Sequence, residues 1–195
     1  MWLVLVYTIY MKLKSNDILD ALKATAEHME WNGDPVEILL IGGAGAMLTG
    51  MLRSERVTQD CDVIDYQPQD GQQAVLAAAA KVAAKKGLPE KWLNSKAMGL
   101  DILSDGWHSR RILIKKFDTL WIYGASRVDM LVMKFYANRP QDREDIFDMA
   151  PTPDELAKVR RYLNMMRVPS KQANLDQVAS AFELLDAVEG KLDGA

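Results

Sequence analysis

Cysteine and histidine are scarce in this sequence. The 195 residues include one cysteine, Cys61, and two histidines, His28 and His108. A single cysteine cannot form an internal disulfide, and so few ligands cannot build a cysteine-rich or histidine-rich metal centre. A chain without disulfides suits the reducing cytoplasm, which is the location we expect.

Excess positive charge and long apolar runs are also missing. The chain has 24 basic and 27 acidic residues, a net charge of -3, which excludes binding to nucleic acid by bulk charge alone. Its most apolar stretch, residues 1–10 (MWLVLVYTIY), is shorter than the roughly 20 residues of a membrane span and lacks the features of a secretory signal. We expect no membrane partner. The stretch is either an edge strand or docking segment, or an upstream extension of a chain that begins at Met11.

The remaining pattern predicts an α/β (α+β) core followed by helices. Apolar residues make up 49% of the chain and charged residues 26%, as in ordinary globular proteins. We predict an extension at 1–14, a core at 15–150 and C-terminal helices at 151–195. In the core we expect helices at 15–32, 44–52, 71–86, 127–138 and 141–149, strands at 36–41, 60–66, 111–117 and 119–123, and a short helix or loop around 92–94.

Two short motifs in the core carry possible chemistry. Gly42 and Gly43 follow a predicted strand and open a helix, a turn whose backbone amides can face a phosphate. Asp60 and Asp62 lie two apart on the next strand, so their carboxylates share a face, with Cα atoms roughly 6 to 7 Å apart. Such a pair suits Mg²⁺ (or Mn²⁺), although a solvated strand end also explains it. By alternation, Asp65 belongs to the opposite face, with Cys61.

A third motif lies in the later helices. The helix that carries Lys134 is apolar on most sides, so this lysine must reach either a surface or a counter-charge. It either neutralises a triphosphate or forms a structural salt bridge. Asp142 and Asp145 are one turn apart near Arg139, and they orient the lysine or the nucleotide unless they form a solvated face.

Together these motifs resemble the nucleotidyltransferase superfamily with its polymerase-β-like fold. The glycine pair followed by the segment Arg56-Val57-Thr58-Gln59-Asp60-Cys61-Asp62, and then by Lys134, Arg139 and the run from Asp142 to Asp145, looks most similar to the AbiEii-type branch and related bacterial families. The resemblance implies a mixed sheet flanked by helices and the transfer of a nucleoside monophosphate from a nucleoside triphosphate to a hydroxyl.

The resemblance also assigns roles to the motif residues. Asp60 and Asp62 would hold the metal, and Gly42 and Gly43 would contact phosphate with Thr58 supporting the loop. Lys134 would neutralise the triphosphate, with Asp142 and Asp145 beside the nucleotide. RNA or tRNA would be an acceptor, and a toxin or phage-defence role with an antitoxin or another protein partner would follow.

One departure from the superfamily favours an alternative function. Members generally carry a third carboxylate on a later strand, but the strands expected at 111–117 and 119–123 hold no acid between their ends. Asp101 and Asp118 are the available substitutes, and Ala44 stands where many members have serine. The alternative is a degenerate module that binds a nucleotide or a protein without catalysis.

The C-terminal helices are locally basic. This excess of positive charge either guides RNA to the site or forms a solvated face. The residues concerned are Lys158, Arg160, Arg161, Arg167 and Lys171.

Overall fold

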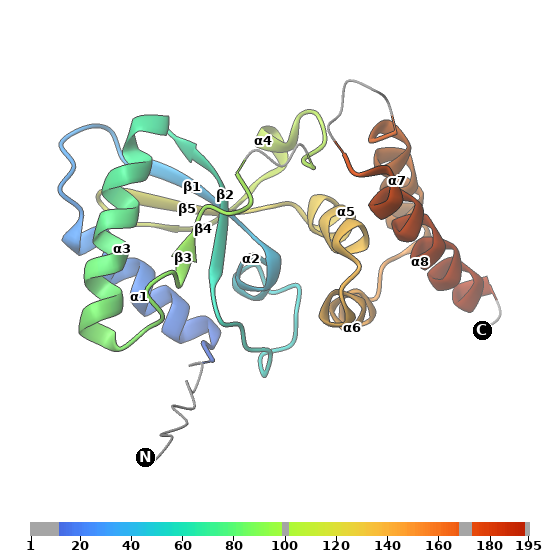
Figure 1. Ribbon diagram of the computed structural model, residues 1–195, viewed down its shortest axis with the longest axis horizontal. Helices are drawn as coiled ribbons and strands as arrows, with labels where there is room; N and C mark the ends of the chain where they lie inside the picture. The colour runs from blue at the N-terminus through green and yellow to red at the C-terminus, as the bar shows by residue number, and fades with distance from the viewer. Residues whose placement is uncertain (1–11, 99–101, 168–172, 194–195) are drawn as a thin grey trace, which may run out of the picture.

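The computed structural model describes residues 12–98, 102–167 and 173–193 (Figure 1). An α/β part at the left of Figure 1 continues into a helical part at the right. Its elements are α1 (Ser15–His28), β1 (Val36–Ile41), α2 (Gly42–Leu48), β2 (Cys61–Gln67), η1 (Gln69–Gly71), α3 (Gln72–Lys86), β3 (Leu93–Asn94), α4 (Trp107–Arg110), β4 (Ile112–Lys116), β5 (Leu120–Gly124), α5 (Arg127–Ala137), α6 (Pro140–Met149), α7 (Pro153–Met165) and α8 (Leu175–Asp193).

The five strands form one mixed sheet in the order β3-β2-β1-β5-β4. The central strand β1 pairs antiparallel with β2 and parallel with β5. The edge strands extend the sheet, β3 parallel to β2 and β4 antiparallel to β5. This mixed sheet with its flanking helices confirms the fold class predicted from the sequence.

Strand β1 forms the centre of the core because nearly all of its side chains are apolar. Of its six residues only Glu37 is not buried. Helices α1 and α3 lie side by side, and Val36 packs against Gly71 at the start of α3, where a Cβ on the glycine would come within 2.4 Å of the valine. The two-sided burial explains why the strand reads as a continuous apolar run.

Because of a β-bulge in β2, Asp65 lies on a different face from the one predicted. The register pairs Ile41 with Asp62 and Leu39 with Asp65, and it shifts between Leu39 and Leu40. Cross-strand partners share a face, and residues two apart in β1 share a face, so Asp62 and Asp65 lie on the same face. The prediction that Asp65 belongs to the opposite face was wrong because the bulge adds one residue to β2.

Leu93 and Asn94 form the strand β3 where a short helix or loop was predicted around 92–94. Leu93 pairs with Cys61 and Asn94 with Asp62. Trp92 is fully buried, and its indole Nε1 donates a hydrogen bond to the carbonyl of Ala79 in α3. A two-residue strand is too short to show any periodicity in the sequence, so its tertiary contacts decide its conformation.

Helix α2 begins and ends earlier than predicted. It covers Gly42–Leu48 rather than 44–52, so both glycines belong to its first turn. It packs against β1, β2, β5 and α5, and a Cβ on Gly45 would come within 2.7 Å of the carbonyl oxygen of Leu40. This close approach brings the first turn of α2 against the sheet.

Helix α5 connects the sheet to the C-terminal helices. The hydroxyl of Ser126 accepts a hydrogen bond from the backbone of Asp129 and so caps the N-terminus of α5, which begins at the predicted Arg127. Helix α5 packs against α2, α6, α7 and α8 (Figure 1). Among the described residues, no helix is both long and apolar enough to cross a membrane.

Candidate functional site

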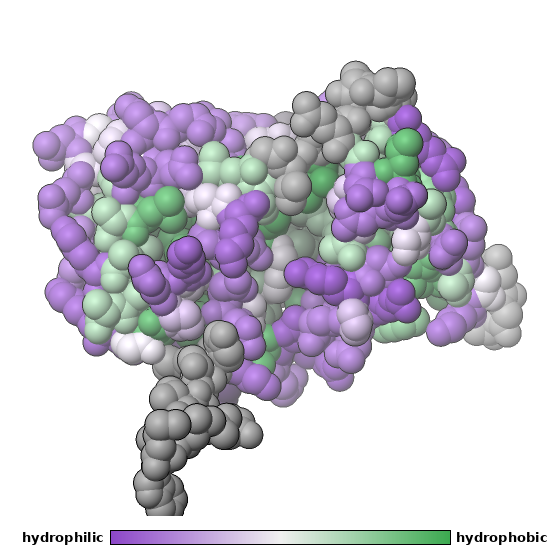
Figure 2. Space-filling model, in the orientation of Figure 1, coloured by the Kyte–Doolittle hydropathy of each residue, from purple (hydrophilic) through white to green (hydrophobic). Residues whose placement is uncertain are grey.

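A cleft of about 550 Å³ opens beside the first turn of α2. Hydrophilic side chains cover most of the face drawn in Figure 2, and the surface is hollowed between the sheet part and the C-terminal helices. The cleft brings together the segment before β2, the start of β2 and the first turn of α6. Its lining residues are Lys12, Gly43, Arg56, Val57, Thr58, Gln59, Asp60, Asp62, Arg139, Pro140, Gln141, Asp142 and Asp145.

Asp60 and Asp62 form the acidic wall of this cleft. Both are half-buried, on either side of the fully buried Cys61 at the start of β2. Burial and the neighbouring charge of Asp62 raise the pKa of Asp60, while Lys96 and Arg139 act in the opposite direction. Two carboxylates that repel each other at the edge of a solvent-filled cleft are a donor set that fits a divalent cation with oxygen ligands.

The glycine pair lies directly against this acidic wall. Gly42 has a positive φ of 64°, and a Cβ on it would lie 3.2 Å from Oδ2 of Asp62. A Cβ on Gly43 would lie 3.2 Å from the hydroxyl oxygen of Thr58. Thr58 donates this hydroxyl to the carbonyl of Asp60 at 3.1 Å, which holds the turn before β2. The structure therefore brings Gly42, Gly43, Thr58, Asp60 and Asp62 together.

The strand beside β2 carries an amide next to Asp62, not a third acid. Asn94 of β3 pairs in register with Asp62, and only 5% of its surface is exposed. Asp118 is exposed in the turn between β4 and β5, at the opposite end of β1 from Asp62, and Asp101 lies outside the described residues. Within the described ranges no three histidine, cysteine or acidic side chains cluster as a metal site.

Lys134 lies behind the cleft, in a buried network of ion pairs. Its ammonium is 2.6 Å from Oδ2 of Asp145 and 3.5 Å from Oδ1 of Asp142, and its side chain is 2% exposed. Neither aspartate has more than 5% of its side chain exposed. The predicted neighbourhood of Lys134, Asp142 and Asp145 is therefore present, with the lysine charge already compensated by the two acids.

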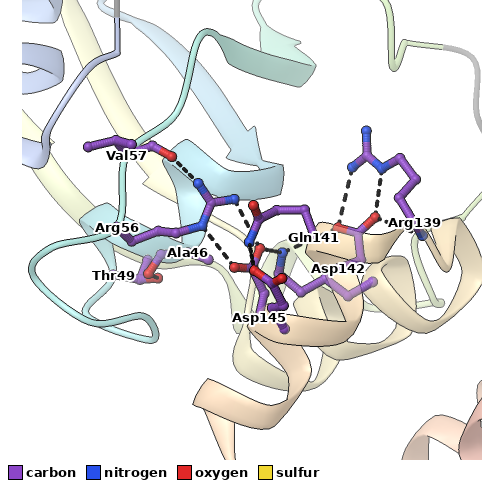
Figure 3. A network of polar contacts seen from close by, with 10 residues as sticks. Ala46, Thr49, Arg56, Val57, Arg139, Gln141, Asp142 and Asp145 are labelled. Carbon is purple, nitrogen blue, oxygen red and sulfur yellow. Dashed lines mark hydrogen bonds and ion pairs between the residues drawn. The ribbon is translucent and has the colours of Figure 1, made fainter.

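Two arginines extend the network into the cleft (Figure 3). Arg56 donates through Nε to Asp145 at 2.9 Å and through Nη1 to the carbonyl of Val57. Arg139 donates through Nε to Oδ2 of Asp142 at 2.6 Å and through Nη2 to Oδ1 at 3.3 Å. The hydrogen bonds from Arg56 and Lys134 outweigh burial and lower the pKa of Asp145.

Arg56 and Arg139 were not predicted as site residues, although both belong to the motifs that carry the resemblance. The sequence does contain a signal for them, because each lies within six residues of a predicted site aspartate. Lys12, which also lines the cleft, carries no such signal because it belongs to no motif.

The basic residues of the C-terminal helices are partly compensated. Arg160 of α7 is paired at 2.5 Å with both Asp186 and Glu189 of α8. The guanidinium of Arg167 lies 4.1 Å from the centre of the Phe182 ring. Lys171 lies outside the described residues.

Comparison with protein families gives a match over more than half of the chain. A family model described as "nucleotidyltransferase of unknown function (DUF6036)" matches residues 17–152, more than half of the chain. The comparisons with curated proteins and with solved structures give no match. The matched range contains the glycine pair, both aspartates of the cleft and the whole ion-pair network.

Proposed function

Because the chain belongs to the family of nucleotidyltransferases of unknown function (DUF6036), we propose that its cleft transfers a nucleoside monophosphate from a nucleoside triphosphate to a hydroxyl acceptor. The observation that supports this most is the close approach of Gly42 to Asp62, where a Cβ on the glycine would lie 3.2 Å from Oδ2, with Gly43 and Asp60 in the lining of the adjoining cleft. A nucleoside triphosphate bound there would have the backbone of the glycine turn and two carboxylates beside it, in a cleft of about 550 Å³.

The reaction requires little covalent chemistry from the protein. The acceptor oxygen forms a bond to the α-phosphorus, the bond from that phosphorus to the oxygen bridging the β-phosphorus breaks, and pyrophosphate leaves. The acceptor proton passes to solvent. The protein's contribution is positioning and charge stabilisation.

Five residues in or beside the cleft have roles in this proposal. Asp60 and Asp62 hold Mg²⁺ or Mn²⁺, which when bound supplies positive charge to the phosphates. Gly42 and Gly43 allow the phosphate chain to approach the backbone. Thr58 fixes the turn that aims Asp60 into the cleft.

Incubation with α-³²P-labelled nucleoside triphosphates, Mg²⁺ and total RNA tests the proposal. RNA is the acceptor that the sequence resemblance implies. We expect label in RNA with the wild type, and at least about 100-fold less with Asp60→Asn or Asp62→Asn, since a metal site supplies several kcal/mol to phosphoryl chemistry.

A matched control is Asp65→Asn, which removes an acid from the same face of the same strand outside the cleft lining. It should retain wild-type incorporation. Equal incorporation by all three variants and the wild type would place the activity elsewhere.

Asn94 beside Asp62 favours a second candidate, a module that binds nucleotide without transferring it. This candidate predicts a nucleoside triphosphate-dependent rise in melting temperature with no label transfer. The absence of both effects would exclude the nucleotide-binding function as well.

The toxin or defence role and the likeness to AbiEii-type proteins remain predictions from the resemblance. Induced expression in a bacterial host tests the role. Growth arrest by the wild type, with normal growth under Asp60→Asn, would support it, and equal growth would count against it.

A further inference from the structure

The five charged residues of the ion-pair network do not balance. Lys134, Arg56 and Arg139 bring three positive charges, whereas Asp142 and Asp145 bring two negative charges. The formal charges of these five residues therefore sum to +1, and Asp60 and Asp62 line the same cleft.

The three cations differ in how far an anion in solvent can reach them. The side chain of Lys134 is 2% exposed, that of Arg56 is 18% exposed and that of Arg139 is 69% exposed. Lys134 does not line the cleft, whereas Arg139 does. The excess charge is accessible chiefly through Arg139.

Arg139 is also held in place before any ligand arrives. Asp142 accepts from its Nε at 2.6 Å, from its Nη2 at 3.3 Å and from its backbone N–H at 3.4 Å. The aspartate pair influences it as well, since hydrogen bonding to Asp142 and the charges of Asp142, Asp62 and Asp60 raise the pKa of Arg139 against the effect of burial. A guanidinium held in this way loses little side-chain entropy on binding phosphate.

The geometry points to Arg139, rather than Lys134, as the cation that contacts the phosphate chain of the nucleotide, with Lys134 acting behind it as the charge partner of Asp142 and Asp145. The inference rests on the proposed function, because it concerns the ligand of the same cleft. A guanidinium presents parallel donors that match phosphate oxygens, and such charge-assisted bonds are among the stronger ones in proteins. The phosphates would then lie between the aspartate pair with its metal and Arg139.

Inorganic tripolyphosphate with Mg²⁺ is the direct probe, since it carries the phosphate chain without a base. Isothermal titration calorimetry of the wild type, Arg139→Gln and Arg143→Gln separates the specific contact from bulk charge. Arg143 is the matched control: it is exposed on α6, whose N-cap is Arg139, it lies outside the cleft lining, and its side chain donates to Asn138. We expect Arg139→Gln to weaken binding by about tenfold or more, and Arg143→Gln to remain within about twofold.

Lys134→Met completes the test. This variant leaves Asp145 paired with Arg56 and Asp142 paired with Arg139, so a folded protein should bind tripolyphosphate within about threefold of the wild type. Equal binding by Arg139→Gln and the wild type would overturn the inference, as would a folded Lys134→Met protein that loses more affinity than Arg139→Gln. If the wild type binds neither tripolyphosphate nor any nucleoside triphosphate, the proposed function fails together with it.

Discussion

The ammonium of Lys134 lies 2.6 Å from Oδ2 of Asp145, and Oδ1 of the same carboxylate accepts a hydrogen bond from Arg56 at 2.9 Å. One buried acid thus joins helix α5, helix α6 and the segment that leads into Asp60. The position of the cleft walls relative to each other depends on this carboxylate.

Asp145→Asn should destabilise the protein by about 3 to 5 kcal/mol, because it breaks a buried ion pair by removing one partner. The pKa of Asp145 is lowered in the folded state, so its contribution is present above the unfolded value near 3.8 and is lost as the pH falls through the folded value. Urea unfolding at pH 7 and at successively lower pH measures the effect. A loss that stays constant down to the lowest pH would contradict the ion-pair origin.

Lys134→Met should cost clearly less stability than Asp145→Asn. It leaves two acids and two arginines in one-to-one pairs, whereas the aspartate variant leaves Lys134 with only Asp142 at 3.5 Å. The same urea titrations compare the two variants directly. A greater loss with Lys134→Met would show that the lysine is the indispensable charge.

Asp60→Asn should raise the melting temperature at neutral pH while abolishing transfer. Burial and the charge of Asp62 raise the pKa of Asp60, so its charged form opposes folding. Stability is fully present below the unfolded value and is lost as the pH rises through the folded value. Differential scanning calorimetry at pH 7 without divalent metal measures the change. A lower melting temperature would mean that the Asp60 carboxylate has an unrecognised stabilising partner.

Gly42→Ala should impair the site beyond its effect on the backbone. Gly42 has φ of 64° and Gly50 has φ of 73°, so alanine at either position costs about 1 kcal/mol of strain. Only at position 42 does the new Cβ meet Asp62, at 3.2 Å, whereas nothing lies within 4 Å at position 50. Urea unfolding should first show that the two variants lose similar stability. Label transfer should then fall with Gly42→Ala and persist with Gly50→Ala. Equal label transfer by both variants would show that Gly42 does not contribute to the site.

Asn94→Asp should place a third carboxylate beside Asp62. In the absence of metal it should lower the free energy of unfolding by about 1 to 3 kcal/mol, because the new charge is buried next to the carboxylate of Asp62. Mn²⁺ should then raise the melting temperature more than it does for the wild type. If Mn²⁺ stabilises both proteins equally, the metal does not lie next to β3.

The sequence was sufficient for the elements whose signals are local. Strand β1 was predicted with the bounds Val36 and Ile41 because a continuous apolar run ends at a glycine pair. The start of α5 was predicted at Arg127 because an apolar helical pattern begins there. The same local signals brought the glycine pair and Asp60 and Asp62 into one predicted site.

What the sequence could not reveal depends on contacts between distant segments. The bulge that turns Asp65 toward the face of Asp62 arises from pairing with β1, and no residue of β2 marks it. The pairing of Asp145 with Arg56 joins residues 89 positions apart. Spacing alone could therefore place Lys134 near Asp142 and Asp145, but it could not show that the lysine is buried with them.

Two labels on the same nucleotide test most directly whether this cleft transfers a nucleoside monophosphate. Parallel reactions with α-³²P-labelled and γ-³²P-labelled triphosphate, Mg²⁺ and total RNA follow the two ends of the phosphate chain. We expect the α label to enter RNA and the γ label to leave as pyrophosphate, both in an Asp60-dependent manner. Transfer of the γ label to RNA, or release of it as inorganic phosphate without transfer of the α label, would contradict nucleotidyl transfer.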